Sequence, residues 1–134
     1  MSLGDLMAHL GAGSDVAIVV TDGTLAAPGP TILYANAAFE KMTGYGSAEL
    51  LGASPRLMQG PRTSLAARKA IAKALRAGQR HTTVMVNYRK SGEPYHCEID
   101  LFPIVSASGE LVNVVALERE VDRRPGRPPA RPQT

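Results

Sequence analysis

The chain has 134 residues, 44% of them hydrophobic and 20% charged, a composition typical of one globular domain. Its formal charge of +3 comes from residues 122–134, which carry four Arg and one Asp, because residues 1–121 carry eleven basic and eleven acidic side chains. A neutral body predicts no nucleic-acid partner, and the lack of an apolar run of roughly 20 residues predicts no membrane span. The N-terminus also lacks the basic region of a signal peptide, so the sequence predicts a cytoplasmic protein.

The first third of the chain predicts strands followed by short helices. Residues 1–13 are a predicted cap helix, because their leucines and Met share one side, and so short a helix must dock on the body or on a partner. Strands are predicted over residues 16–21 and 31–34, with a loop rich in Gly and Pro between them. Asn36 and Ser47 are the predicted N-caps of two short helices, each followed by a glycine that suits a left-handed stop.

The second half predicts one longer helix and then three strands. Thr63 is the predicted cap of an alanine-rich helix that runs to Gly78. The strands are predicted over residues 81–90, 94–105 and 110–121, joined by tight turns that contain glycine.

Apolar patterning assigns faces to these strands. The strand over residues 94–105 alternates, with Tyr95, Cys97, Ile99 and Leu101 on one face and His96, Glu98 and Asp100 on the other. The last strand is apolar on both faces, which predicts a covered outer sheet face. Either the N-terminal helix or a second copy of the chain could cover this outer face. The predicted apolar patch on it consists of Leu111, Val115, Leu117, Val84 and Val86.

Reactive side chains are sparse. Cys97 is the one cysteine, and the three histidines share no ligand spacing, so the sequence predicts no disulfide and no metal site. It contains neither a Gly-rich phosphate loop nor a nucleophile elbow, so no catalytic residue is assigned and no enzymatic activity is predicted. Residues 122–134 hold four prolines and no apolar period, which predicts a disordered Arg/Pro-rich tail.

The predicted order β-β-α-α-α-β-β-β describes an α+β domain, one antiparallel sheet with helices across one face. Four segments resemble the light-oxygen-voltage (LOV) branch of the PAS domains, namely LYANAAFEKMTGYGSAELLG, RLMQGPRTS, NYRKSGEPY and GELVNVVALEREV. The resemblance covers residues 14–121. It implies a PAS fold, a five-stranded antiparallel sheet with short helices that enclose a ligand pocket, and a sensory role.

The resemblance also places a flavin site with several departures. LOV domains form a light-driven bond from a cysteine to the flavin, and Pro55 stands at that cysteine position, beside Ser54 in place of asparagine. Proline has no thiol, so the usual adduct is excluded there. Arg56 and Gln59 match positions that meet the flavin phosphate and ribityl chain. A second phosphate-binding arginine position falls on Ala72, next to Lys73.

Three positions match the edge that reads the flavin ring. Asn87 keeps the first asparagine of that edge, Cys97 replaces the second, and Glu118 replaces a glutamine on the last strand. We expect each lost hydrogen bond to cost about 1 kcal/mol, which weakens flavin binding without removing the pocket. A carboxyl at Glu118 is expected to be neutral or bonded to Asn87 or Arg56.

Each of these residues also has a structural interpretation. Asn87 either bonds a neighbour such as Glu118, or water, or contacts a ligand. Arg56 either forms a surface ion pair or binds a phosphate. Cys97 is either a small core residue or a redox-active thiol. Glu118 is either a buried, responsive acid or reaches water on a shifted strand.

These observations predict a stand-alone sensory module of LOV-like descent, which senses a ligand or interacts with a protein and forms no cysteinyl–flavin bond. The alternative is a flavin-binding blue-light photoreceptor that works by flavin photoreduction. The candidate cofactor is FMN, and the alternative is none. The expected partner is a protein bound in trans, or a second copy of the chain bound through the outer sheet face.

Overall fold

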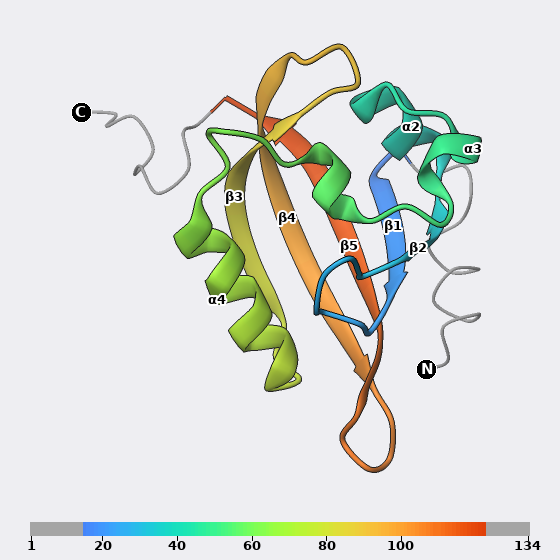
Figure 1. Cartoon of the computed structure of the whole chain (residues 1–134), viewed down its shortest axis with the longest axis vertical. Helices are drawn as coiled ribbons and strands as arrows, with labels where there is room; N and C mark the ends of the chain where they lie inside the picture. The colour runs from blue at the N-terminus through green and yellow to red at the C-terminus, as the bar shows by residue number, and fades with distance from the viewer. Residues whose placement is uncertain (1–14, 123–134) are drawn as a thin grey trace.

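The structure, a computed structural model, describes residues 15–122, which form one five-stranded antiparallel sheet (Figure 1). The order across the sheet is β2-β1-β5-β4-β3, so β5 is central and β2 and β3 are the edges. The strands are β1 (Ala17–Asp22), β2 (Ile32–Ala35), β3 (His81–Tyr88), β4 (Pro94–Val105) and β5 (Leu111–Val121). The predicted strands are therefore present and form the one antiparallel sheet that the sequence predicted.

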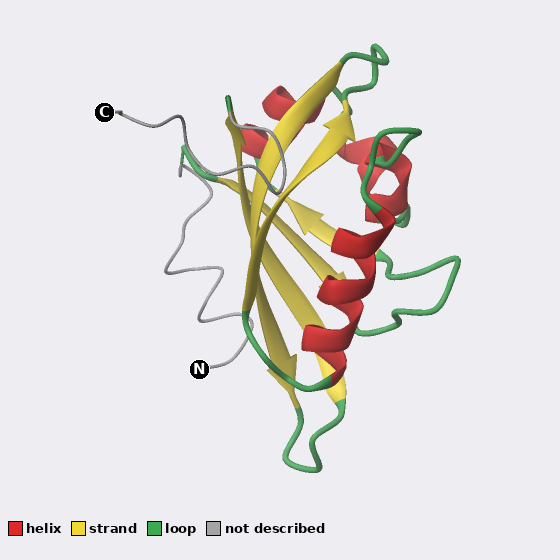
Figure 2. Cartoon of the chain, turned by 90° about the vertical axis from the view of Figure 1, so that its left-hand side faces the viewer, coloured by secondary structure: helices red, strands yellow, loops and turns green. Residues whose placement is uncertain are grey.

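Short helices connect β2 to β3 and cover one face of the sheet, and Figure 2 shows the longest of them, α4, lying along that face. They are α2 (Ala37–Thr43), α3 (Ser47–Leu50), the 3₁₀ helix η1 (Pro55–Met58) and α4 (Leu65–Arg76). Each contributes a side chain to the same core on the inner face of the sheet, namely Phe39, Leu50, Met58 and Leu75. The α+β fold with helices packed on one face is confirmed.

Of the three predicted helix N-caps, the structure contains one. Asn36 caps α2 as predicted, with its Oδ1 accepting from the backbone N–H of Phe39 at 3.0 Å and of Ile18 at 2.9 Å. The other two predicted caps were wrong by one residue. Gly46 precedes α3, with Ser47 as its first residue, and Ser64 caps α4 in place of Thr63.

The alternation predicted for β4 is confirmed, because Tyr95, Cys97, Ile99 and Leu101 all lie in the inner core. On β5 the expected faces hold only in part. A register shift between Ile104 and Val105 turns Leu111 toward the inner core and leaves Val112 exposed. The predicted placement of Leu111 on the outer face was therefore wrong.

The outer face carries a second apolar cluster, which we call the outer cluster. Ile18, Val20 and Val115 are its buried centre, with exposed fractions of 1–2%, and its partly buried members are Tyr34, Phe102, Ile104 and Leu117. Val84 and Val86 lie on the same outer face, opposite Glu98 and His96 on β4, but they are not members of the outer cluster. The predicted apolar outer face is confirmed on β5 by Val115 and Leu117, and Val86 of β3 is buried as well. Ile18 and Val20 of β1 belong to this face although the sequence did not predict them there.

Two sequence predictions fall outside the described residues, the cap helix of residues 1–13 and, apart from Asp122, the tail of residues 122–134. No helix between residues 15 and 122 is long and apolar enough to cross a membrane. Within the same residues, no group of three or more His, Cys, Asp or Glu side chains gathers around a point that could hold a metal ion.

Candidate functional site

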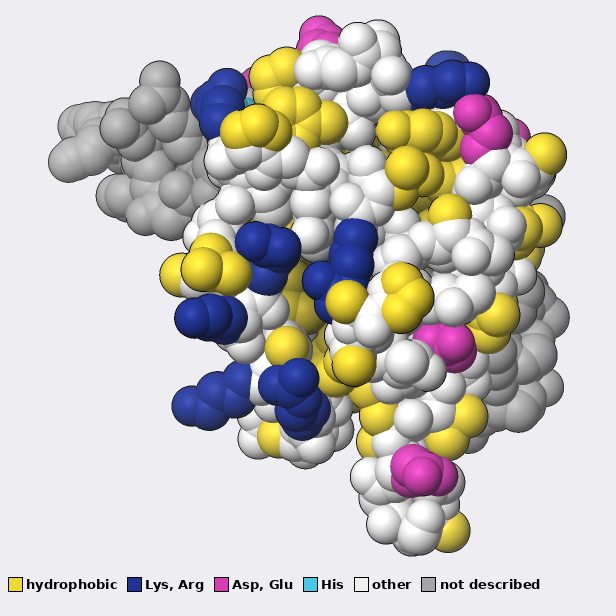
Figure 3. Space-filling model, viewed as in Figure 1, with side chains coloured by type: hydrophobic (Ala, Val, Ile, Leu, Met, Phe, Trp, Pro, Cys, Tyr) yellow, Lys and Arg dark blue, Asp and Glu magenta, His cyan; other side chains and the backbone are white. Residues whose placement is uncertain are grey.

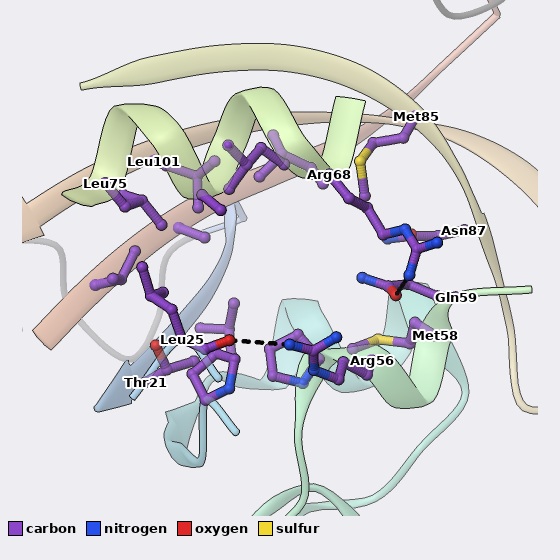
Figure 4. Close-up of a pocket in the computed structure, with 18 of the residues that line it drawn as sticks. Thr21, Leu25, Arg56, Met58, Gln59, Arg68, Leu75, Met85, Asn87 and Leu101 are labelled. Atoms are coloured by element: carbon purple, nitrogen blue, oxygen red, sulfur yellow. Dashed lines mark hydrogen bonds between the residues drawn. The ribbon is translucent and has the colours of Figure 1, made fainter. Parts of the chain in front are cut away.

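A cavity of about 400 Å³ lies between the inner face of the sheet and the layer formed by η1 and α4 (Figure 4). Its size is within the range of about 300–1,000 Å³ that is usual for small-molecule sites. The walls are mainly apolar, with side chains from the sheet and from both helices, including Val19, Met58, Ile71, Leu75, Met85, Leu101 and Val114. Such walls suit a planar or apolar group, and the polar side chains at particular points of the wall fix its orientation.

One corner of the cavity is polar. Asn87 on β3 is buried there, and Gln59 and Arg68 come from the end of η1 and the first turns of α4. Figure 4 shows these three side chains pointing toward one another. The Arg68 Nη1 donates to the Gln59 Oε1 at 3.1 Å. We call Gln59, Arg68 and Asn87 the polar corner.

The segment that carries Gln59 is fastened to the edge of the sheet. The Thr63 Oγ1 donates to the carbonyl of Val86 at 2.6 Å and accepts from the N–H of Gly60 at 3.0 Å. The Tyr88 hydroxyl accepts from the N–H of Arg62 at 2.9 Å, and the Tyr88 ring packs so closely on Gly60 that a Cβ there would collide with it. This explains why Thr63 is unavailable as a helix cap, and it holds the polar corner against β3.

Basic side chains surround the outer part of the cavity. Arg68, Lys69 and Arg76 of α4 and Arg56 of η1 all line it, and Figure 3 shows Lys and Arg side chains beside a hollow with hydrophobic side chains inside. Arg68, Ala72 and Arg76 are spaced four residues apart, so they share one face of α4. We call Arg56, Lys69 and Arg76 the basic rim; it favours an anionic group at the mouth of the cavity.

Arg56 has a different environment from the one expected. Its Nε donates to the carbonyl of Gly29 at 2.7 Å, and its Nη2 donates to the carbonyl of Leu25 at 2.9 Å. Among the described residues it forms no ion pair, so the surface ion pair expected for it was wrong. Arg56 therefore ties the loop between β1 and β2 to the cavity while remaining part of its wall.

An acid lies at the sheet side of the cavity. Glu118 on β5 is 6% exposed, and its Oε1 accepts from the Cys97 Sγ at 3.4 Å. Burial raises the pKa of Glu118 to about 7, and the thiol hydrogen bond acts in the opposite direction. The interpretation in which Glu118 reaches water was wrong, and its partner is Cys97, where we had expected Asn87 or Arg56.

Cys97 itself is inaccessible. It is 0% exposed, and burial raises the pKa of its thiol far above the usual value, with the Glu118 carboxyl adding to the effect. The neighbouring Tyr95 hydroxyl is also buried and has no well-formed hydrogen bond to any residue of the described chain. A thiol in these surroundings is unreactive, which favours the interpretation of Cys97 as a small core residue.

The predicted site residues divide into two groups. Asn87, Gln59, Arg56, Glu118 and Pro55 all line the cavity. Cys97 and Ser54 are not among its lining residues, and the Ser54 Oγ instead caps η1 by accepting from the N–H of Arg56 at 3.2 Å. Any role of these residues in binding a cofactor stays a prediction.

Sequence reasoning missed the three basic lining residues of α4, namely Arg68, Lys69 and Arg76. It looked for a basic residue at Ala72 and named the adjacent Lys73, which is exposed and does not line the cavity. The spacing of four residues from Ala72 to Arg68 and to Arg76 was the available signal.

The sequence matches the PAS domain family over residues 15–122. It is 41% identical over 96 residues to a blue-light-activated histidine kinase of Rhizobium johnstonii, covering 71% of this chain and 27% of that protein. It is 33% identical over 105 residues to phototropin-2 of Oryza sativa subsp. japonica, covering 78% of this chain and 11% of that protein. The chain thus spans only about a quarter or less of these relatives.

The fold comparison agrees. The structure described as "Flavin Analogue Sheds Light on Light-Oxygen-Voltage Domain Mechanism" superimposes with a TM-score of 0.78 at 30% sequence identity. The match covers 88% of this chain and 85% of that chain. The chain is therefore similar to one part of larger proteins, and the kinase activity of such a relative is a property of that protein.

Proposed function

Because the chain belongs to the PAS domain family and is of the LOV type, we propose that it senses a ligand held non-covalently in the cavity. The ligand we propose is FMN, and the sensory domain forms no cysteinyl–flavin bond. The observation that carries this proposal is one cavity with a polar corner, a basic rim and no thiol among its lining residues.

The residues present fit FMN in chemical terms. The apolar walls suit a fused ring, the polar corner offers amide and guanidinium groups, and the basic rim offers charge for a phosphate. The buried Arg68 Nε lacks a hydrogen-bond partner among the described residues, which is the condition expected at a site that a ligand completes. When bound, FMN supplies absorption of blue light and redox chemistry.

The proposed absence of an adduct rests on where the one cysteine lies. Cys97 is the one cysteine of the chain, and it is buried beside Glu118 outside the cavity wall. Pro55, which stands where the LOV resemblance places the photoactive cysteine, lines the cavity. In our proposal no side chain of this domain is therefore able to form a thioether with the ligand.

A route for signalling runs through β5. Glu118 faces the cavity, while its neighbour Leu117 belongs to the outer cluster on the opposite face. A ligand that changes the hydrogen bonding or charge of Glu118 would shift the central strand and hence the outer cluster. We propose that the outer cluster transmits this change to a second copy of the chain or to a protein bound in trans.

A second candidate function is a blue-light photoreceptor that works by flavin photoreduction. The observation that favours it is Glu118, whose pKa of about 7 lets it hold or release a proton beside the cavity near neutral pH. The two functions share one site and differ in whether light changes the state of the protein.

The experiment is a titration of the purified protein with FMN, followed by quenching of flavin fluorescence. Ala72→Phe fills the cavity from α4, and Ala70→Phe makes the same change at an exposed position of α4 outside the cavity wall. We expect the wild type and Ala70→Phe to bind FMN and Ala72→Phe to lose binding. Absence of binding by the wild type, or equal binding by all three proteins, would overturn the proposal.

A further inference from the structure

Arg68 combines two features that set it apart from the basic rim. One end of its guanidinium is engaged, because Nη1 donates to the Gln59 Oε1 at 3.1 Å. The Nε atom is buried and has no hydrogen-bond partner among the residues that the structure describes. The guanidinium is thus held in place by Gln59 with one of its donors unsatisfied.

A buried, unsatisfied donor of a charged group is costly, and native proteins rarely keep one without a function. Arginine cannot lose its proton in this setting, so the Nε donor can be satisfied only by an acceptor. Because Arg68 lines the cavity, that acceptor can come from a ligand.

The neighbouring side chains define what kind of acceptor fits. Gln59 uses its Oε1 for Arg68, so its amide N–H groups remain to be donated. Asn87 contributes an amide N–H₂ group, which also interacts with the buried Tyr95 hydroxyl, and one carbonyl oxygen. The polar corner therefore offers donors from Gln59 and Arg68, while Asn87 offers a side-chain carbonyl oxygen as an acceptor. The complementary partner is an imide edge, in which two carbonyl oxygens flank one N–H.

We propose that Arg68 is a specificity-determining residue that donates to a carbonyl oxygen on the imide edge of the ligand's ring. Its permanent charge selects rings whose edge is rich in acceptors or carries negative charge. This role differs from phosphate binding, which falls to the more open basic rim, because a phosphate keeps part of its hydration at the mouth. The inference rests on the proposed function, since it takes the ligand to be a flavin.

The test separates the ring edge from the phosphate by using two probes, FMN and riboflavin, which share the ring and differ in the phosphate. Arg68→Met removes the guanidinium and keeps an unbranched side chain on the helix. Lys73→Met is the matched control, because it removes a charge from α4 outside the cavity wall. Arg76→Met removes a charge from the basic rim. Binding is measured by fluorescence quenching, and thermal unfolding without flavin reports whether each variant is folded.

We expect Arg68→Met to weaken FMN and riboflavin by the same factor, about tenfold to a hundredfold, as for a lost hydrogen bond to a charged group. Arg76→Met should weaken FMN alone, and Lys73→Met should change neither. A loss by Arg68→Met that is confined to FMN would show that Arg68 binds the phosphate and overturn the inference. Unchanged binding would overturn it as well. If the wild type binds neither flavin, the proposed function fails, and the inference fails with it.

Discussion

Replacing Glu118 by Gln should change how the stability of the domain depends on pH. The folded protein holds the proton of this carboxyl up to a pKa of about 7, whereas the unfolded chain releases it near 4.5. Between these values the folded state binds more protons than the unfolded state, so stability falls as pH rises. The contribution is complete below pH 4.5, is lost progressively up to about pH 7, and stays lost above it.

The size of the effect follows from the pKa difference. About 1.36 kcal/mol per pKa unit gives about 3 kcal/mol of unfolding free energy lost by the wild type across this range. Glu118→Gln has no proton to release, so its stability relative to wild type should rise by about that amount from pH 4.5 to pH 7. The other side chains are the same in both proteins, so their contributions cancel in the comparison.

The assay is urea unfolding at half-unit steps from pH 4.5 to pH 8, with Glu110→Gln as a control at an exposed turn. The control should follow the wild-type curve. A difference between Glu118→Gln and wild type that stays constant within about 0.5 kcal/mol over the whole range would refute the reasoning. It would mean that Glu118 is ionised and hydrated in the folded protein.

Three further predictions concern the scaffold, the cavity and the outer face. Asn36→Ala should cost about 2–4 kcal/mol of unfolding free energy, because it removes a helix cap and two hydrogen bonds to β1 and its flank. Ser64→Ala removes a cap alone and should cost about 1 kcal/mol. Pro55→Cys should form a photoadduct visible by absorption once FMN is bound; bound FMN without an adduct would show that the cavity geometry does not support attack from that position. Leu117→Arg should convert a dimer to a monomer in light scattering, with Leu33→Arg on the edge strand as control, and an unchanged mass would argue against the outer cluster as the interface.

The sequence predicted the fold because its local signals agree with the tertiary structure. Alternation placed Tyr95 and Cys97 on the inner face, and the capping preference of Asn36 located the start of α2. Agreement between local and global preferences is what makes such patterns readable. The face of Leu111 was predicted wrongly because a prediction from alternation assumes regular strand pairing. A bulge reverses the face of every residue beyond it.

The site was less predictable because its polar groups depend on contacts between distant segments. In the sequence Thr63 resembles a helix cap, but in the structure its hydroxyl donates to the carbonyl of Val86. In the sequence Arg56 resembles a solvent-exposed charge, but in the structure it donates to two carbonyls of the loop between β1 and β2. Arg68 stands one helical turn before the position that the family pattern indicated, so only the packing of α4 on the sheet reveals that it lines the cavity.

We propose that this LOV-type cavity holds a flavin without forming a covalent bond to it. The most direct measurement is the absorption spectrum of the FMN-loaded protein before and during blue-light illumination, without an added electron donor, followed by the intact mass of the illuminated chain. We expect bound FMN, an unchanged spectrum and an unmodified chain mass. A light-induced loss of the flavin absorption together with a chain heavier by one FMN would contradict it, as would a protein that binds no FMN.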